Sequence, residues 1–167
     1  MRARGHGILG EAPPHEIIRS SPLTNLDLLP AAPHLAGALI ELVGVPEREY
    51  YLRKFLHLVR HTYDYVLIDL PPSLSLLTVN GLMAADEVII PVQAEYYSLE
   101  GIGQLLTTLS LIRDNLLHDI HVAGALITMH DKRSRLSGDV IHNLRKNFPH
   151  FVYRVDIPRS VALAEAP

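Results

Sequence analysis

The sequence contains no cysteine and no tryptophan, and only 6% of its 167 residues are aromatic. The absence of cysteine excludes disulfide bonds, thiolate catalysis and cysteine-based zinc sites. Because aromatic side chains are few, the core must consist mostly of leucine, isoleucine, valine and alanine. No apolar run approaches the roughly 18 residues of a membrane-spanning helix, and the first residues lack the apolar stretch of a signal peptide. A soluble, cytoplasmic protein is therefore expected.

Lysine is also scarce. The chain has three copies, Lys54, Lys132 and Lys146, and none of them follows a glycine. A phosphate-binding P-loop needs glycine N–H groups facing the phosphates, a following lysine, and a serine or threonine for the metal. The 167 residues contain no such loop, so tight binding of ATP by this chain alone is not expected.

Other catalytic signatures are missing as well. Neither a nucleophilic serine motif nor a dinucleotide fingerprint is present, which argues against an unrelated hydrolase or dehydrogenase. The GIGQL stretch at 101–105 lies inside a helical pattern and is expected to be a packing site. His57 and His61 have the spacing of metal ligands on a helix but no evident third ligand, so no metal site is expected there.

Strand-like and helix-like segments alternate along the chain. Helices between strands imply crossovers in a parallel sheet covered on both sides, and no linker or repeat divides the chain. We expect one α/β domain over residues 1–167. The expected strands are 25–30, 66–69, 87–92, 122–129 and 151–157, and the expected helices are 34–43, 46–61, 74–85, 98–116 (with Ser98 as N-cap) and 136–148.

Asp69 ends the segment YVLIDLPP, whose uniformly apolar residues predict a strand buried on both faces. Ligands of parallel sheets bind at the carboxyl ends of the strands, where Asp69, Gln93, Met129 and Pro158 are expected to lie. Two interpretations of Asp69 stay open. Its carboxylate can ligate Mg²⁺ directly or through water, or it can cap the following turn.

Positive charge gathers late in the chain, although the net charge is −3. Between residues 132 and 159, seven basic residues stand against two acidic ones. This segment is either a solvated helix face with a basic loop or an interface for an anionic partner such as DNA. The basic residues are Lys132, Arg133, Arg135, Arg145, Lys146, Arg154 and Arg159.

The stretch YDYVLIDLPPSLSLLTVNGLMAADEVIIPVQAEYYSLEGIGQLL at 63–106 closely resembles the ParA/Soj family of partitioning ATPases. The resemblance continues upstream through NLDLLPAAPHLAGALIELV and downstream through GALITMHDKRSRLS and VDIPRSVALAEAP. It implies a three-layer P-loop NTPase fold of the deviant Walker type, related to MinD. The family's KGGVGKTT-type loop, first strand and switch aspartate would precede the matched region, and a further loop and helix would follow it. The chain is therefore expected to correspond to the middle two-thirds of such a protein.

The resemblance also implies residue roles. Asp69 matches the Walker B aspartate that supports Mg²⁺, and the turn that contains Pro71 and Pro72 matches the segment that senses the γ-phosphate. Met129 and Pro158 fall where relatives border the adenine. The residues implied in DNA contact are Arg133, Arg159 and Arg135, the last as a replacement for an arginine that relatives have at the position of Ala162.

Partners and cofactors follow from the same resemblance. Family members bind ATP and Mg²⁺, dimerise around ATP, bind DNA non-specifically on the nucleoid, and are stimulated by a ParB-type protein. For this chain we expect a chromosome- or plasmid-partitioning role without ATP hydrolysis on its own. The alternative is a non-enzymatic scaffold that binds DNA or a protein without nucleotide. Because the first strand would be missing, we also expect marginal stability, a rearranged sheet or a strand supplied by a partner.

Overall fold

The computed structural model describes residues 13–31, 35, 37, 41–71, 73, 75–95 and 98–165. By its internal contacts the chain divides into two compact units, Met1–Ala85 and Asp86–Pro167. None of the helices in the described residues is both long enough and apolar enough to cross a membrane.

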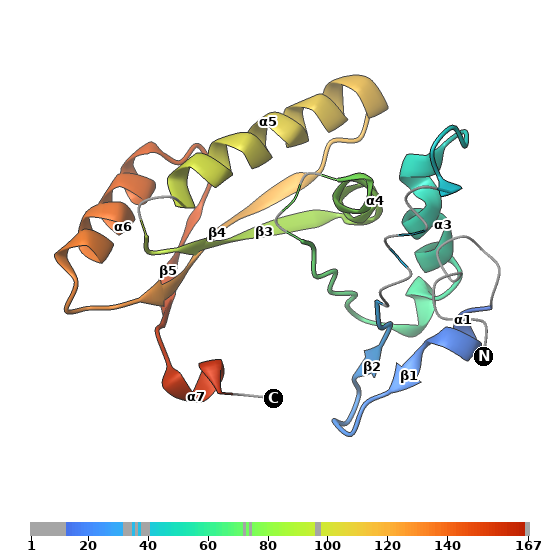
Figure 1. Cartoon of the computed structure of the whole chain (residues 1–167), viewed down its shortest axis with the longest axis horizontal. Helices are drawn as coiled ribbons and strands as arrows, with labels where there is room; N and C mark the ends of the chain where they lie inside the picture. Colours follow the sequence, from blue (N-terminus) through green and yellow to red (C-terminus); the bar gives the residue numbers. More distant parts are fainter. Residues whose placement is uncertain are drawn as a thin grey trace. The chain divides into compact units, whose positions relative to one another are not determined.

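The second unit is built on a parallel three-stranded sheet with the strand order β3-β4-β5 (Figure 1). A helix follows each strand, so the chain returns to the same end of the sheet before each new strand, as a parallel sheet requires. The predicted α/β fold with a parallel sheet is thus confirmed. The elements are β3 (Glu87–Gln93), α5 (Ser98–Leu116), β4 (His121–His130), α6 (Arg135–Asn147), β5 (Val152–Pro158) and α7 (Val161–Ala164).

The core of this unit lies between the sheet and helices α5 and α6. Alternate residues of β3 and β4 point into it, and on β4 Ala125 is fully buried and Ile127 is 1% exposed. Burial of aliphatic side chains contributes roughly 25 cal/mol per Å² of apolar area, so this layer is the main source of stability for the unit. The cluster consists of Ile90, Val92, Ala94, Ile102, Ala125, Ile127, Ile141 and Leu144.

Strand β4 contains a bulge that glycine makes possible. The register runs from Val88 opposite Val122 to Ile89 opposite Gly124, which leaves one extra residue on β4. Gly124 has φ +146°, and a Cβ atom there would lie 2.7 Å from the carbonyl oxygen of Phe151. The same oxygen accepts a hydrogen bond from Ala125 N–H at 2.9 Å. Glycine therefore allows the close approach that starts the pairing of β4 with β5.

The first unit is made of short helices and one small hairpin. Strands β1 (Arg19–Ser20) and β2 (Asp27–Leu28) pair antiparallel, and α3 packs against α4. The other elements are α1 (Pro14–Ile17), η1 (Arg48–Tyr50), α3 (Tyr51–His57), η2 (Arg60–Thr62) and α4 (Leu76–Ala84).

The predicted strand at 66–69 does not form. Residues 65–70 belong to no helix or strand, and Tyr65 and Leu67 are 86% and 92% exposed instead of buried. An apolar run becomes a buried strand only where a neighbouring strand satisfies its backbone groups. None of the five strands in the described residues pairs with this segment. Leu70, at its end, packs against Gly81 of α4, where an added Cβ would lie 2.2 Å from a Leu70 methyl carbon.

Two other predictions need correction, and two more fall wholly or partly outside the described residues. The strand expected at 25–30 is reduced to the two residues of β2. The helix expected at 46–61 is divided into η1, α3 and η2, because Glu47 has a left-handed backbone (φ 56°) and the last turns become 3-10 helix. Most of 34–43 and the side chain of Ser98 lie outside the described residues. The remaining predicted helices and strands are confirmed, with ends that shift by one or two residues.

Asn80 is a buried polar residue that joins α4 to the chain before it. Its side-chain oxygen accepts a hydrogen bond from Leu52 N–H at 3.2 Å. Its amide nitrogen donates to the carbonyl oxygens of Arg48 at 2.9 Å and Leu76 at 3.0 Å. Asn80 is 2% exposed, so water has little access to replace these hydrogen bonds to the backbone.

We predict that Asn80→Ala lowers the free energy of unfolding by about 2–3 kcal/mol, because it leaves the N–H of Leu52 and the carbonyl of Arg48 without their partner. The measurement is urea unfolding of the 167-residue chain. Asn115→Ala is the matched control, since Asn115 also donates to the residue four positions earlier but is exposed. Equal effects of the two substitutions would contradict the role of Asn80.

Candidate functional site

The carboxyl ends of β4 and β5 bring together residues that are distant in sequence. His130 stands opposite Pro158 in the register, and the N–H of Arg159 donates to the carbonyl oxygen of His130 at 3.1 Å. Met129 and Pro158, the two residues predicted to border an adenine, therefore lie at the same end of neighbouring strands, and both are exposed. Pro158 lies at this end of the sheet because the pairing of β4 with β5 extends as far as His130 and Pro158.

The end of β4 has an unusual backbone. Met129 has φ +54°, a left-handed conformation that residues with a Cβ rarely adopt. Such a conformation costs on the order of 1–3 kcal/mol and persists where the surrounding contacts require it. One of these contacts is the backbone hydrogen bond from Arg159, and another is a side-chain hydrogen bond between His130 Nδ1 and Asp156 Oδ2. The strand therefore ends in a turn that β5 holds in place.

A compact turn follows β4 and starts α6. Asp131 Oδ1 accepts hydrogen bonds from the N–H of Arg133 at 2.9 Å and from its Nε at 3.3 Å. Ser134 then caps α6, because its hydroxyl accepts a hydrogen bond from Ser137 N–H at 3.3 Å. Ser137 is buried and donates through its own hydroxyl to the carbonyl of Ala94, just after β3, at 3.0 Å. The turn is thus fixed to the ends of β3 and β5.

Cations surround Asp131. Its pKa is lowered, first by the hydrogen bonds from Arg133 and then by the positive charges of Arg133 and Arg159. The Arg133 side chain is 92% exposed, and Lys132, Arg135 and Arg159 are exposed as well. Arg133 and Arg159, two of the residues predicted to contact DNA, therefore both lower the pKa of the same carboxyl group, and Arg133 also contacts it directly. Arg135 is the first residue of α6, and exposed Ala162 lies in α7.

Asp69 lies in the first unit, in the extended segment after Tyr63. It is exposed and does not end a strand. Pro71 is exposed beside it, and Pro72 lies outside the described residues. Gln93 ends β3 as predicted, and its side chain is exposed. The role of Asp69 as a metal residue stays a prediction.

The described residues do not form a complete site for ATP and Mg²⁺. They contain no group of three or more histidine, aspartate or glutamate side chains placed to hold a metal ion. No glycine in the sequence is followed by lysine, so the N–H cradle and counter-charge for a triphosphate are missing from these 167 residues. Asp69 alone would meet a triphosphate as like charge against like charge.

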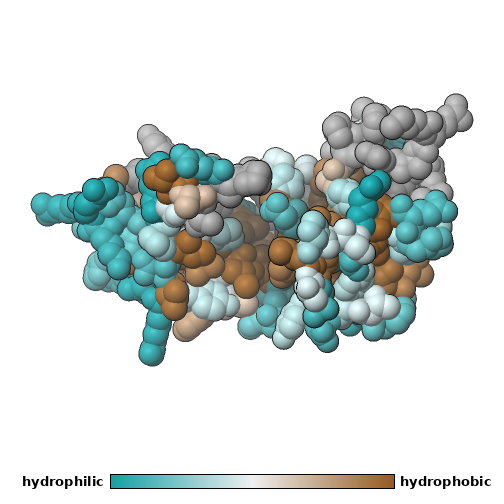
Figure 2. Space-filling model, turned by 90° about the horizontal axis from the view of Figure 1, so that it is seen from below, coloured by the Kyte–Doolittle hydropathy of each residue, from teal (hydrophilic) through white to brown (hydrophobic). Residues whose placement is uncertain are grey.

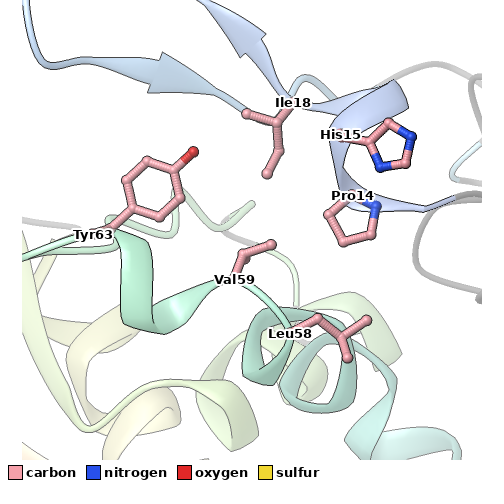
Figure 3. A pocket seen from close by; sticks show the side chains of 6 residues that line it. All are labelled: Pro14, His15, Ile18, Leu58, Val59 and Tyr63. Atoms are coloured by element: carbon pink, nitrogen blue, oxygen red, sulfur yellow. The ribbon is translucent and has the colours of Figure 1, made fainter.

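A shallow apolar hollow in the first unit was not predicted from the sequence (Figure 3). The Tyr63 hydroxyl donates to Asp27 Oδ2 at 2.9 Å, and this bond to a carboxylate raises the pKa of Tyr63. The polar group of this side chain is thus already engaged, and no predicted site residue lines the hollow. Its lining residues are Pro14, His15, Ile18, Leu58, Val59 and Tyr63.

Comparisons with known proteins agree with this fold. Residues 5–122 match the model of a family described as an AAA domain, and the chain belongs to this family. Over 152 residues it is 49% identical to the sporulation initiation inhibitor protein Soj of Bacillus subtilis, which covers 91% of this chain and 60% of that protein. It is 43% identical to the chromosome-partitioning ATPase Soj of Treponema pallidum, over 96% of this chain and 63% of that protein. The resemblance to ParA/Soj partitioning proteins is therefore confirmed.

Solved structures share the fold of this chain. Cobyrinic acid a,c-diamide synthase from Mycobacterium smegmatis, with an ATP analogue and magnesium bound, superposes with a TM-score of 0.87 at 36% identity. The match covers 95% of this chain and 65% of that one. McdA from Cyanothece in complex with ATP has a TM-score of 0.86 at 19% identity and shows the fold alone. The chain spans about 60% of the length of the curated relatives named above.

The pair His130–Asp156 is the feature of this site that sequence analysis missed. The two residues are 26 positions apart, on different strands. A signal existed, since each lies one residue from the end of a predicted strand. The pairing depends on a register that the sequence pattern does not specify.

We predict that Asp156 stabilises the folded chain in a pH-dependent way. The hydrogen bond from His130 is the main cause that lowers the pKa of Asp156 below its ordinary value of 3.8. A carboxylate with a lowered folded pKa contributes stability above the unfolded value, and this contribution is lost as pH falls through the folded pKa. The melting temperature of the unmodified chain should exceed that of Asp156→Asn at pH 7, and the difference should shrink below about pH 4.

Thermal unfolding followed by circular dichroism between pH 7 and pH 3 measures this. Asp114→Asn is the control, because Asp114 forms an exposed pair with Arg113 and such pairs contribute little. A difference between the unmodified chain and Asp156→Asn that is the same at every pH would contradict the role of the carboxylate.

Proposed function

We propose that this chain acts in the partitioning of a chromosome or plasmid and binds DNA without sequence preference. The observation that carries the proposal is the cationic turn at the carboxyl ends of β4 and β5, found in a chain 49% identical to a Soj protein. Four exposed basic residues make up this region: Lys132 and Arg133 in the turn after β4, Arg135 at the start of α6, and Arg159 directly after β5. These residues are hereafter called the cationic edge.

The chemistry of the cationic edge suits a phosphate backbone better than a small ligand. Its side chains are exposed instead of lining a pocket, and the guanidinium groups of Arg133 and Arg159 can each donate two hydrogen bonds to phosphate oxygens. Phosphate contacts of this kind carry no sequence information, and they supply affinity by releasing counterions. Non-specific binding on the nucleoid, in the cytoplasm, is the corresponding cellular role.

ATP and Mg²⁺ enter the proposal only through relatives. A structure similar to this chain holds an ATP analogue with magnesium. In this chain, Asp69 with Pro71 and Pro72, and Met129 with Pro158, are the residues proposed to face the metal and the nucleotide. A ParB-type protein and a second copy of the chain are the proposed partners. The alternative is a scaffold that binds DNA or a protein without nucleotide.

We predict that the chain binds random-sequence double-stranded DNA and that binding weakens steeply with salt. Arg133→Ala should lower the affinity about three- to tenfold and reduce the slope of log affinity against log salt by about 1, because one phosphate contact is lost. Fluorescence anisotropy at several salt concentrations measures both quantities. Arg113→Ala removes the same charge from α5 and should change neither. Salt-insensitive binding, or no binding, would contradict the proposal.

We also predict that the 167-residue chain does not turn over ATP, because it has no P-loop lysine. A sensitive phosphate-release assay with Mg²⁺ present measures this. Asp69→Ala is the test variant and Asp64→Ala is its matched control, since both residues are exposed and lie five positions apart. Turnover that Asp69→Ala abolishes and Asp64→Ala preserves would show the prediction to be wrong.

A further inference from the structure

The His130–Asp156 pair lies beneath the cationic edge without being part of its exposed surface. The two side chains are 17% and 26% exposed, whereas the side chain of Arg133 is 92% exposed. A phosphate approaching the edge meets the arginines, and the pair stays largely covered. Its effect on a bound anion would therefore be exerted through the residues that it holds.

The side chain and the backbone of His130 are both bound by residues at the carboxyl end of β5. Its ring pairs with Asp156, and its carbonyl oxygen accepts the N–H of Arg159 at 3.1 Å. The residue before it, Met129, has the left-handed backbone described above, and the residues after it are Asp131, Lys132 and Arg133. The same two contacts thus set the direction of the chain from the end of β4 to Arg133. They also set the start of the segment after Arg159.

Charged groups from the ends of β4 and β5 act on the pair and on its neighbour Asp131. Asp156 faces His130 first and then Lys132, while Asp131 faces Arg133 and Arg159. We propose that the His130–Asp156 pair is a positioning element that keeps Arg133 and Arg159 on one phosphate-binding edge. This inference rests on the proposed DNA-binding function.

Simple electrostatics and positioning predict opposite signs for one substitution. Asp156 is an anionic group near the edge, so its removal should strengthen the binding of a polyanion if charge alone matters. If the pair positions the arginines, the same removal lets the end of β4 relax and weakens binding. The His130–Asp156 pair can therefore be tested by the direction of an effect as well as by its size.

The test compares the binding of random-sequence double-stranded DNA by the unmodified chain and by Asp156→Ala, His130→Ala and the double variant. We expect each single substitution to weaken binding about tenfold and the double substitution to add little, since both remove one interaction. Asp156→Asn keeps an oxygen that can accept the imidazole hydrogen and should restore most of the affinity. Asp114→Ala, which breaks an exposed pair on α5, should leave binding unchanged or slightly stronger.

The salt slope separates positioning from a general loss of structure. Partial unfolding lowers the fraction of active chain but leaves the slope of log affinity against log salt unchanged. Loss of a positioned arginine lowers the slope by about 1. If circular dichroism shows that the alanine variants do not fold, His130→Gln, Asp156→Asn and the variant with both of these substitutions replace them. The slope of log affinity against log salt should then differ between the variant with both substitutions and the unmodified chain.

Each outcome decides the matter. Binding that Asp156→Ala leaves equal or makes tighter overturns the inference, and so does an unchanged salt slope. If Arg133→Ala weakens binding while Asp156→Ala and His130→Ala do not, the proposed function stands and only the positioning role falls. Absence of DNA binding by the unmodified chain overturns both.

Discussion

The structure of the second unit depends on strand β4, which pairs with a neighbour along each edge. Its backbone groups are satisfied by β3 on one side and β5 on the other, and its core face is closed by α5 and α6. Ala125 and Ile127 have almost no exposed surface, so β4 can neither shift its register nor shorten without opening the core. Gly124 allows the close approach to Phe151 that starts this pairing. The point at which β4 ends is fixed as a consequence, and the cationic edge begins there.

Charge and backbone geometry are coupled at this edge. The turn after His130 starts from a left-handed residue, is tied to β5 by one backbone and one side-chain contact, and continues into the capped start of α6. Exposed arginines on a flexible loop would lose conformational entropy when they bind phosphate. Arginines on a turn held by two strands and a helix would lose less, which favours the proposal that a modest number of cations binds DNA here. Among the described residues, large apolar side chains also reach the surface, as the brown areas of Figure 2 show.

Sequence patterns predicted the second unit well and the first unit less well. The apolar runs at 87–92, 122–129 and 151–157 became strands because each has a neighbour within the described residues. The run at 66–69 has the same composition but no such neighbour, and a strand exists only through pairing that a local pattern does not report. For the site, the resemblance indicated Arg133 and Arg159, and the structure brings them together. His130 and Asp156 were missed because their contact depends on register across 26 residues.

We propose that DNA binds at the cationic edge and not at the segment around Asp69. Amide hydrogen exchange of the 167-residue chain, measured with and without double-stranded DNA, tests this most directly. We predict that DNA slows amide exchange at residues 131–135 and 159–161. Residues 65–70 should exchange rapidly with and without DNA, because no strand of the described residues pairs with them. Slowing that is confined to 65–70, or absent from both segments, would contradict it.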